Sequence, residues 1–301
     1  MNAIEIKNLC KNFGEKQALS GLNMTVPVGS IYGFIGENGS GKSTTEKIIC
    51  GLIHKTSGDV KIYDKPHTDS DVRASMGVLI EAPGCFPNVS VWNNLMIQAT
   101  NLSIKDKEAA VRKVLTMVRM EGAAGNKFKN CSLGMKQRIG IAMALLGSPK
   151  LLVLDEPING LDADGMRIMR EILTDIAKSG STVLVSSHIL GELEKIATHY
   201  GIIRNGKMIV EMTAEELENS CPTFVAIVAA DMKTAKEVLN KKYSKVLEDE
   251  QKEYLRVYDA TSPEEVAKYL YDNGVIINEL KTDKIGLEEY YINLMANGEV
   301  K

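Results

Sequence analysis

The chain has 301 residues, of which 44% are hydrophobic, so it is long enough for about two domains with apolar cores. Its formal net charge of −3 and its isoelectric point near 5.9 argue against a nucleic-acid binder that depends on a basic surface. No run approaches the ~18 apolar residues needed to span a bilayer, and the first residues lack the basic-then-apolar pattern of a secretory signal. The five cysteines lack the short paired spacing of zinc sites. We therefore expect a cytoplasmic globular protein.

The first part of the chain is predicted to form strands followed by a glycine-rich loop. Residues 4–10 and 22–28 have the pattern of two strands joined through a turn. The apolar stretch 31–35 predicts a third strand, which leads directly into a segment that fits the P-loop pattern G-x-x-x-x-G-K-[ST]. The residues after this segment are compatible with a helix, which is the context that the motif requires.

The P-loop predicts a bound nucleoside triphosphate. Its glycines allow backbone N–H groups to turn inward around the β- and γ-phosphates, and the following helix directs its positive dipole end toward the same charge. Lys42 adds a positive charge, and Ser43 adds a hydroxyl that can bind Mg²⁺. We expect nucleotide contacts from Gly36, Glu37, Asn38, Gly39, Ser40, Gly41, Lys42, Ser43 and Thr44.

The middle of the chain changes from mixed α/β to helical and back. From about residue 84 to residue 147 the pattern is helical, with apolar residues at helical spacing in 107–120. Strands then alternate with helices in the order of a parallel α/β protein. We expect strands over 151–154 and 182–186 and helices over 165–179 and 190–198. The sequence thus predicts an α/β core with a helical insert.

Composition shifts near residue 220, because seven of the ten tyrosines lie beyond it. The pattern there predicts a strand, a helix over 232–242, a strand over 254–259, a helix over 263–273, a further strand and a terminal helix. We therefore expect two domains, 1–220 and 221–301. The second is predicted to be a small α+β appendage.

A second chemical motif is an apolar strand, 151–154, that ends in Asp155 and Glu156. In a P-loop protein the first carboxylate can hold Mg²⁺ through water. The second can orient and deprotonate a water that attacks the γ-phosphate. The alternative is an acidic strand end that only caps a turn, and the P-loop in the same chain favours the catalytic interpretation.

Further short segments stand in order around these two motifs. They are Lys11-Asn12-Phe13-Gly14, Cys131-Ser132-Leu133-Gly134-Met135-Lys136-Gln137-Arg138, Asn159-Gly160-Leu161-Asp162 and Ser187-His188. With them, residues 3–220 resemble the ATP-binding subunit of an ABC transporter. The segments resemble, in order, the family's adenine-stacking aromatic residue, its L-S-G-G-Q signature, its D-loop and its switch histidine. Taken alone, Phe13 is also consistent with hairpin packing and His188 with a buried core histidine.

The resemblance implies a P-loop NTPase fold of the ABC type. Its parts are an α/β core, an N-terminal antiparallel β subdomain, the helical insert at about 84–147 and the C-terminal appendage. It also implies ATP and Mg²⁺ as cofactors, with Glu156 as general base and His188 in contact with the γ-phosphate and the attacking water. Ser43, Glu81 and Asp155 are the implied Mg²⁺ ligands.

The resemblance further implies a head-to-tail dimer of two ATP-binding subunits. In such a dimer, Ser132 and Gly134 of one chain cap the γ-phosphate that Lys42 of the other chain holds. Asp162 couples the two sites across the dimer. Ser132 is also consistent with a simple helix cap, which the same residue provides in the family.

Four positions depart from the family pattern. Leu133 replaces a glycine, Met135 replaces a glutamine, and Glu81 stands where most of the family has glutamine. Glu81, the signature segment and the long tail together resemble the branch that exports bacitracin-type and lantibiotic peptides. Glu46 stands where the family buries an apolar residue, and an unpaired buried carboxylate is costly. We therefore expect Glu46 to be partly exposed or paired with a lysine or arginine.

The sequence thus predicts an ATP-hydrolysing subunit that powers a separate membrane permease and lies on the inner face of the cell membrane through that permease. The predicted cargo is a peptide antibiotic or a similar amphipathic substrate, and no nucleic-acid partner is expected. A soluble ABC protein that acts on ribosomes or DNA is one alternative. A regulatory ATP-binding module with weak hydrolysis is the other, and it would follow if Leu133, Met135 and Glu81 disable the cap.

Overall fold

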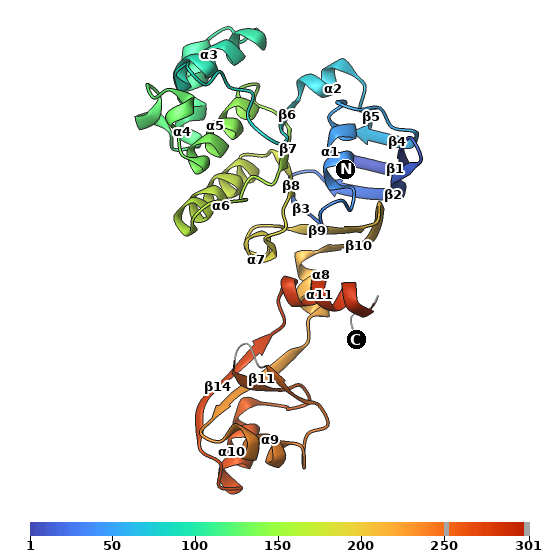
Figure 1. Ribbon diagram of the computed structural model, residues 1–301, viewed down its shortest axis with the longest axis vertical. Helices are drawn as coiled ribbons and strands as arrows, with labels where there is room; N and C mark the ends of the chain where they lie inside the picture. Colours follow the sequence, from blue (N-terminus) through green and yellow to red (C-terminus); the bar gives the residue numbers. More distant parts are fainter. Residues whose placement is uncertain (250–252, 298–301) are drawn as a thin grey trace. The chain divides into compact units, whose positions relative to one another are not determined.

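The computed structural model describes residues 1–249 and 253–297. The chain divides into two compact units, Met1–Ala214 and Glu215–Lys301, and each is described by itself (Figure 1). The first unit contains two sheets and most of the helices. The second contains one small sheet with its own helices.

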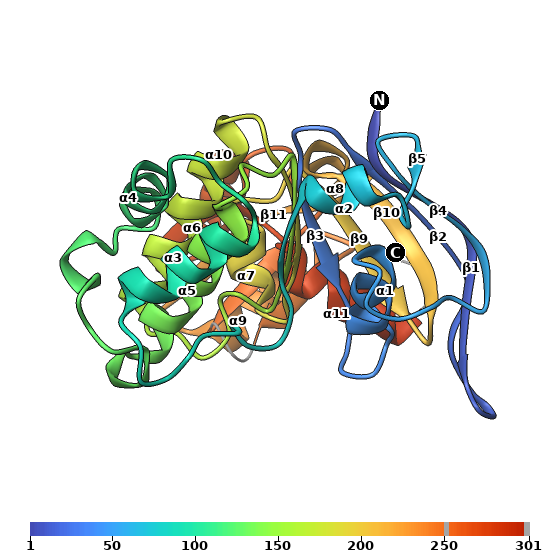
Figure 2. The same cartoon turned by 90° about the horizontal axis from the view of Figure 1, so that it is seen from above.

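An antiparallel sheet of order β2-β1-β4-β5 forms one side of the first unit. It consists of β1 (Asn2–Phe13), β2 (Lys16–Pro27), β4 (Ser57–Ile62) and β5 (Lys65–Pro66). Its buried apolar side chains, such as Ile4, Ile6 and Leu9, face the core that this sheet shares with α1 (Lys42–Ile49). Figure 2 shows β1, β2 and β4 on the opposite side of the unit from the helices α3 to α6.

The central sheet has the order β10-β9-β3-β8-β7-β6 and is parallel apart from its edge strand β10. The strands are β3 (Ile31–Ile35), β6 (Met76–Leu79), β7 (Leu151–Asp155), β8 (Thr182–Ser186), β9 (His199–Arg204) and β10 (Lys207–Thr213). Every residue of β3, β7 and β8 is buried, as expected for parallel strands covered on both faces. Ligands of open α/β sheets bind outside the carboxyl ends of such strands.

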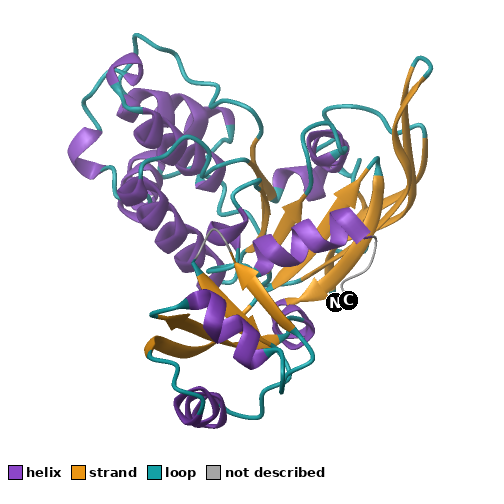
Figure 3. Ribbon diagram, turned by 60° about the horizontal axis from the view of Figure 1, so that its bottom comes forward, coloured by secondary structure: helices purple, strands orange, loops and turns teal. Residues whose placement is uncertain are grey.

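The helices of the first unit fall into two groups. The core carries α1, α2 (Ser70–Ala74), α6 (Ala163–Lys178) and α7 (Leu190–Leu193). The insert consists of α3 (Val91–Asn101), α4 (Lys107–Met117), the 3₁₀ turns η1 (Glu121–Ala123) and η2 (Phe128–Asn130), and α5 (Leu133–Leu145). The insert helices gather together, away from the antiparallel sheet (Figures 1 and 3).

The second unit begins within α8 (Ala214–Ser220) and forms an antiparallel sheet of order β12-β13-β11-β14. Its elements are β11 (Thr223–Ala229), α9 (Met232–Leu239), β12 (Val246–Asp249), β13 (Tyr254–Val257), α10 (Pro263–Asp272), β14 (Ile277–Lys284) and α11 (Leu287–Asn297). The order β-α-β-β-α-β is that of a ferredoxin-like unit. Arg256 on β13 forms ion pairs with Asp249 on β12 and Glu289 on α11.

The predicted fold class is confirmed, with a P-loop α/β core, an antiparallel β part, inserted helices and a small α+β part. Several details of the prediction are wrong or missing. The helix expected over 190–198 ends at Leu193, and residues 194–196 form turns before the chain enters β9 at His199. The strands β5, β6, β9, β10 and β12 were not predicted.

Candidate nucleotide-binding site

The glycine-rich segment forms a tight loop between β3 and α1. Gly39 and Gly41 have positive φ angles of 81° and 115°, which L-residues with side chains rarely adopt. A Cβ on Gly36 would lie 2.5 Å from the carbonyl oxygen of Ile203. Glycine is therefore required at these positions for the loop to curl against the sheet.

Lys42 lies inside this loop with 6% of its surface exposed. Its Nζ donates to the carbonyl oxygens of Gly36 at 2.6 Å and Glu37 at 3.2 Å. The ammonium group is thus held in the curl of the loop, next to the first amides of α1. This combination of a fixed cation, loop amides and a helix N-terminus favours a phosphate group.

The loop opens onto a cavity of about 490 Å³. Its walls bring together residues from the hairpin of β1 and β2, the P-loop, the end of β7 and the β9–β10 turn. The lining residues are Phe13, Lys16, Gln17, Ala18, Asn38, Gly39, Gly41, Lys42, Ser43, Thr44, Asp155, Glu156 and Asn205. Phe13 is 49% exposed, and Lys11 Nζ lies 4.6 Å from its ring centroid. An exposed aromatic ring at one end of a phosphate cavity suits a nucleotide base.

The carboxyl end of β7 delivers the two acidic residues to this cavity. Asp155 is buried, and its Oδ1 accepts a hydrogen bond of 2.9 Å from Ser186 Oγ. The same Ser186 Oγ accepts a hydrogen bond of 3.1 Å from Glu156 N. Ser186 therefore fixes both acidic residues. The sequence prediction missed it, although its place at the end of the neighbouring strand, in register with Asp155, is a signal that the strand pattern contains.

His188 lies beyond the end of β8 and contacts Glu156. Its Nδ1 is 2.6 Å from Glu156 Oε2, and its side chain is half exposed. Glu156 has a positive φ of 51°, a strained backbone conformation of a kind that clusters at active sites. His188 does not line the cavity. It reaches the site through the carboxylate of Glu156.

The signature and D-loop segments lie next to each other, and their residues do not line the cavity. Ser132 is the N-cap of α5, where its Oγ accepts from Met135 N at 3.3 Å. Asp162 is the N-cap of α6, where its Oδ1 accepts from Gly165 N at 2.8 Å. Because Ser132 is the cap, the N–H of Gly134 lies in the first turn of α5, too early for an intrahelical bond. Within one chain, Ser132, Gly134 and Asp162 are thus separate from the P-loop cavity.

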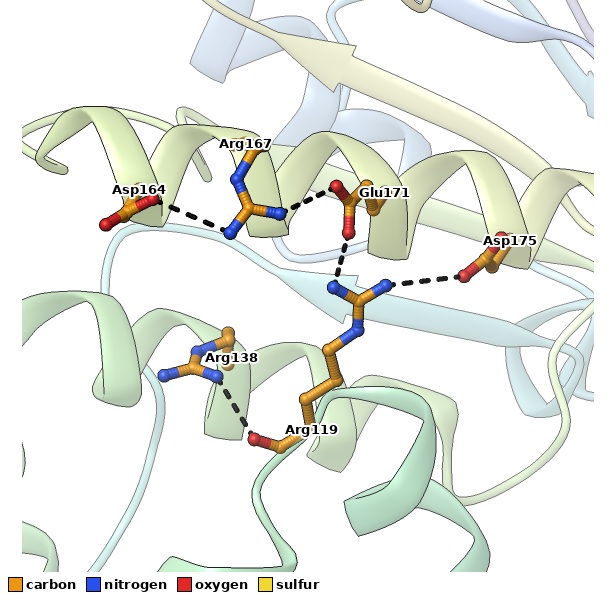
Figure 4. A network of polar contacts seen from close by, with 6 residues as sticks. All are labelled: Arg119, Arg138, Asp164, Arg167, Glu171 and Asp175. Carbon is orange, nitrogen blue, oxygen red and sulfur yellow. Dashed lines mark hydrogen bonds and ion pairs between the residues drawn. The ribbon is translucent and has the colours of Figure 1, made fainter.

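A network of polar contacts joins the signature helix to α6 (Figure 4). Arg138 on α5 donates to the carbonyl oxygens of Gly134 and Arg119. The guanidinium of Arg119 pairs with Glu171 on α6. Burial lowers the pKa of Arg138. These contacts tie the helical insert to the helix that follows the D-loop.

Glu81 also lies outside the cavity lining. Its Oε1 is 2.7 Å from Nζ of Lys47 on α1, and its side chain is 70% exposed. The hydrogen bond from Lys47 holds the pKa of Glu81 below its usual value, and the same bond raises the pKa of Lys47. The sequence alone did not indicate Lys47, because the contact joins two segments that are 34 residues apart.

Glu46 contradicts the expectation that it would be exposed or paired with a basic residue. It is fully buried on α1. Neither carboxylate oxygen has a hydrogen-bond partner among the described residues, although the side chain lies within electrostatic reach of Asp155 and close to Ser186. Burial, with the charge of Asp155, raises the pKa of Glu46 well above its usual value. The folded protein therefore favours the neutral carboxylic acid.

This shift makes a prediction about stability and pH. The folded state keeps the proton of Glu46 at pH values where the unfolded state, with an ordinary pKa near 4.5, releases it. The stability that Glu46 contributes is thus fully present below about pH 4.5 and is lost as the pH rises toward the folded-state pKa. Glu46→Gln should remove this loss, which is at most about 1.4 kcal/mol per pH unit.

Urea unfolding of the nucleotide-free protein, followed through the single tryptophan Trp92, measures the effect from pH 5 to pH 8. The free-energy difference between Glu46→Gln and the parent should grow with pH. Replacement of the exposed Glu108 by glutamine is the matched control. A difference between Glu46→Gln and the parent that stays constant over this range contradicts the assignment.

A P-loop that curls around a buried lysine, beside a strand that ends in two carboxylates, defines a nucleotide-binding ATPase of the P-loop class. Residues 19–159 match the family model described as ABC transporter. The chain belongs to the family of ABC transporter ATP-binding proteins. It is 33% identical to the bacitracin transport ATP-binding protein BcrA of Bacillus licheniformis, over 99% of this chain and 98% of that protein.

Other relatives match with different coverage. The lantibiotic transport ATP-binding protein SrtF of Streptococcus pyogenes is 41% identical over 72% of this chain and 93% of its own length. An uncharacterized ABC transporter ATP-binding protein of Bacillus subtilis, YcbN, is 34% identical over 99% of this chain and 98% of its own length.

Solved structures show the same fold. A nucleotide-free ATP-binding cassette from an ABC transporter matches with a TM-score of 0.66 and 26% identity, over 73% of this chain and 94% of the solved chain. The ADP conformation of the ATP-binding cassette MJ1267 matches with a TM-score of 0.65 and 26% identity, over the same shares of the two chains. The domain is an ATPase that binds nucleotide. Among the described residues, we find no helix with the length and hydrophobicity to span a bilayer.

Proposed function

We propose that this chain hydrolyses ATP to power a separate membrane permease that exports a peptide antibiotic or a similar amphipathic substrate. One observation carries the cargo class. The match to the bacitracin transport protein covers 99% of the chain, and so includes the C-terminal unit as well as the ATPase unit. The lantibiotic relative, which is matched over 72% of the chain, supports the same class of cargo.

We assign the nucleotide contacts to the residues of the cavity. Phe13 is placed to stack on adenine, while Lys42 and the P-loop amides hold the phosphates. Glu156 acts as general base toward the attacking water, and the Nδ1 contact of His188 at 2.6 Å orients its carboxylate. Ser186 holds the end of β7 in place through Asp155 and the backbone of Glu156.

Glu81, the third ligand that the resemblance implied, lies outside the cavity lining and pairs with Lys47. This assignment therefore keeps two Mg²⁺ ligands, Ser43 and Asp155. They line the same cavity and offer a hydroxyl and a carboxylate oxygen, which are the donors that Mg²⁺ prefers. The described residues contain no cluster of three metal-binding side chains. This fits Mg²⁺, which is usually held by one or two protein oxygens together with substrate phosphates. When bound, Mg²⁺ neutralises charge that develops on the phosphates.

We infer a head-to-tail dimer, because Ser132, Gly134 and Asp162 lie away from their own P-loop cavity. The first turn of α5 presents free amides suited to an anion. A second copy of the chain, or a related ATP-binding subunit, would bring this helix end to the γ-phosphate. The assembled dimer would lie on the inner face of the membrane through its permease.

We assign the permease contact to a groove of about 420 Å³ between β6, α3 and α5. Leu52, Val78 and Leu102 line this groove and are 60%, 37% and 42% exposed. Ile80 and Ala82, on either side of Glu81, also line it. A permease segment in the groove would therefore touch the segment that carries Glu81.

Resistance in cells tests this function. The chain should be expressed with its cognate permease in a host sensitive to peptide antibiotics. Expression of the two proteins should raise the inhibitory concentration of bacitracin or of a lantibiotic above that of the host alone, and should leave that of a non-peptide antibiotic unchanged. Lys42→Ala should abolish the increase. Unchanged sensitivity to every peptide tested, with both proteins expressed, contradicts the proposed cargo.

A further inference from the structure

Lys47 lies on the face of α1 that meets the segment after β6, and it forms an ion pair with Glu81. We propose that Lys47 is a positioning residue, which holds the carboxylate of Glu81 beside the P-loop helix and neutralises its charge. The proposal rests on the proposed function, because it concerns how that ATPase site is set before nucleotide binds.

Three features of Glu81 carry the inference. Its Oε1 is 2.7 Å from Lys47 Nζ, so the carboxylate is engaged with a base on the P-loop helix. Its φ of 65° is a left-handed conformation that a residue with a side chain adopts at some cost. Its chain neighbours Ile80 and Ala82 line the groove, and Glu81 itself does not. The segment thus has one side toward the groove and its carboxylate toward α1.

Electrostatics explain why a base is needed at this position. The ammonium of Lys47 lies within electrostatic reach of Asp155 as well as Glu81. Lys42 is bound to carbonyl oxygens inside the P-loop. Without Lys47, the carboxylate of Glu81 would leave an unbalanced negative charge beside α1, the helix whose first turn lines the nucleotide cavity. Lys47 therefore reduces the repulsion between Glu81 and the bound phosphates.

Lys47 also gives Glu81 a defined resting position. The pair is solvent-exposed, and exposed ion pairs contribute little to the stability of the fold. The pair therefore sets where the carboxylate of Glu81 rests before nucleotide binds.

Four proteins test the proposal, namely the parent, Lys47→Met, Glu81→Gln and the double variant. Lys65→Met is the matched control, since Lys65 forms an exposed pair with Asp71 and does not line the cavity. The first readout is amide hydrogen exchange at residues 79–85 without nucleotide. The second is the affinity for Mg²⁺ with a non-hydrolysable ATP analogue, measured by titration calorimetry.

Lys47→Met should speed exchange of this segment and weaken binding of the analogue, each by about two- to fivefold, the range of an exposed ion pair. In the Glu81→Gln background, the same substitution should change binding by less than about twofold, because the charge that it balances is gone. Lys65→Met should leave both readouts unchanged.

Equal effects of Lys47→Met on binding in both backgrounds overturn the proposal, as does unchanged exchange of the segment. A parent protein that fails to bind the analogue overturns the proposed function, and with it any role of the pair in an ATPase. A parent that binds normally while Lys47→Met has no effect overturns the role of Lys47 alone.

Discussion

Glu156→Gln should lower steady-state ATP turnover by about 10²–10⁴-fold, the usual contribution of a general base, and leave ATP affinity within about threefold of the parent. Glutamine keeps the size of the side chain and cannot accept the proton of the attacking water. Lys42 and the loop amides, which hold the phosphates in this assignment, are untouched. The variant should therefore still bind ATP although it no longer hydrolyses it.

Phosphate release and titration calorimetry measure the two quantities separately. Because the variant binds ATP without consuming it, it should also accumulate as an ATP-bound dimer in size-exclusion chromatography. Glu108→Gln, which changes an exposed carboxylate of α4 outside the cavity, is the matched control and should turn over at the parental rate. Turnover of Glu156→Gln within about threefold of the parent excludes Glu156 as the base.

The nucleotide cavity could be predicted from the sequence where the chemistry is local. The P-loop was predictable because its glycines and Lys42 lie close together in the sequence and form one loop. Asp155 and Glu156 were also predictable from a local pattern. They directly follow a buried apolar strand, and ligands of open α/β sheets bind at the carboxyl ends of such strands. The structure places these residues around one cavity.

Contacts between distant segments could not be predicted in the same way. Ser186 reaches Asp155 only through the pairing of β7 with β8, and Lys47 reaches Glu81 only because the segment after β6 returns to α1. Glu46 shows the opposite case. The cost of burial led to the expectation of a basic partner, but protonation is a second way to bury a carboxyl group.

The C-terminal unit was predicted in outline and incompletely in detail. Its helices follow clear apolar spacing, as in α10, where Val266 and Leu270 are buried. The missed strand β12 has only four residues, Val246–Asp249, and its burial pattern shows no buried position. The strand forms because it pairs with β13. A short strand without buried positions has no alternation of apolar and polar residues from which this pairing could be predicted.

The last prediction concerns the site shared between two chains. A Lys42→Ala chain has a weakened phosphate cradle, and a Ser132→Arg chain has a blocked cap. In a mixed head-to-tail dimer, the intact cradle of the second chain meets the intact cap of the first. A mixture of two inactive variants should therefore recover activity. Random pairing makes about half of the dimers mixed, each with one complete site of two, so the recovered rate should approach about a quarter of the parental rate.

Each variant assayed alone should stay inactive, as should a mixture of Lys42→Ala with Lys42→Met, in which no pairing gives a complete site. Ser132 also caps α5, and loss of an N-cap costs about 0.5–2 kcal/mol, so thermal melting must show that Ser132→Arg remains folded. Differently tagged chains show whether mixed dimers form. If they form and the mixture stays as inactive as its components, the signature helix does not complete the site of a second chain, and the head-to-tail arrangement is wrong for this protein.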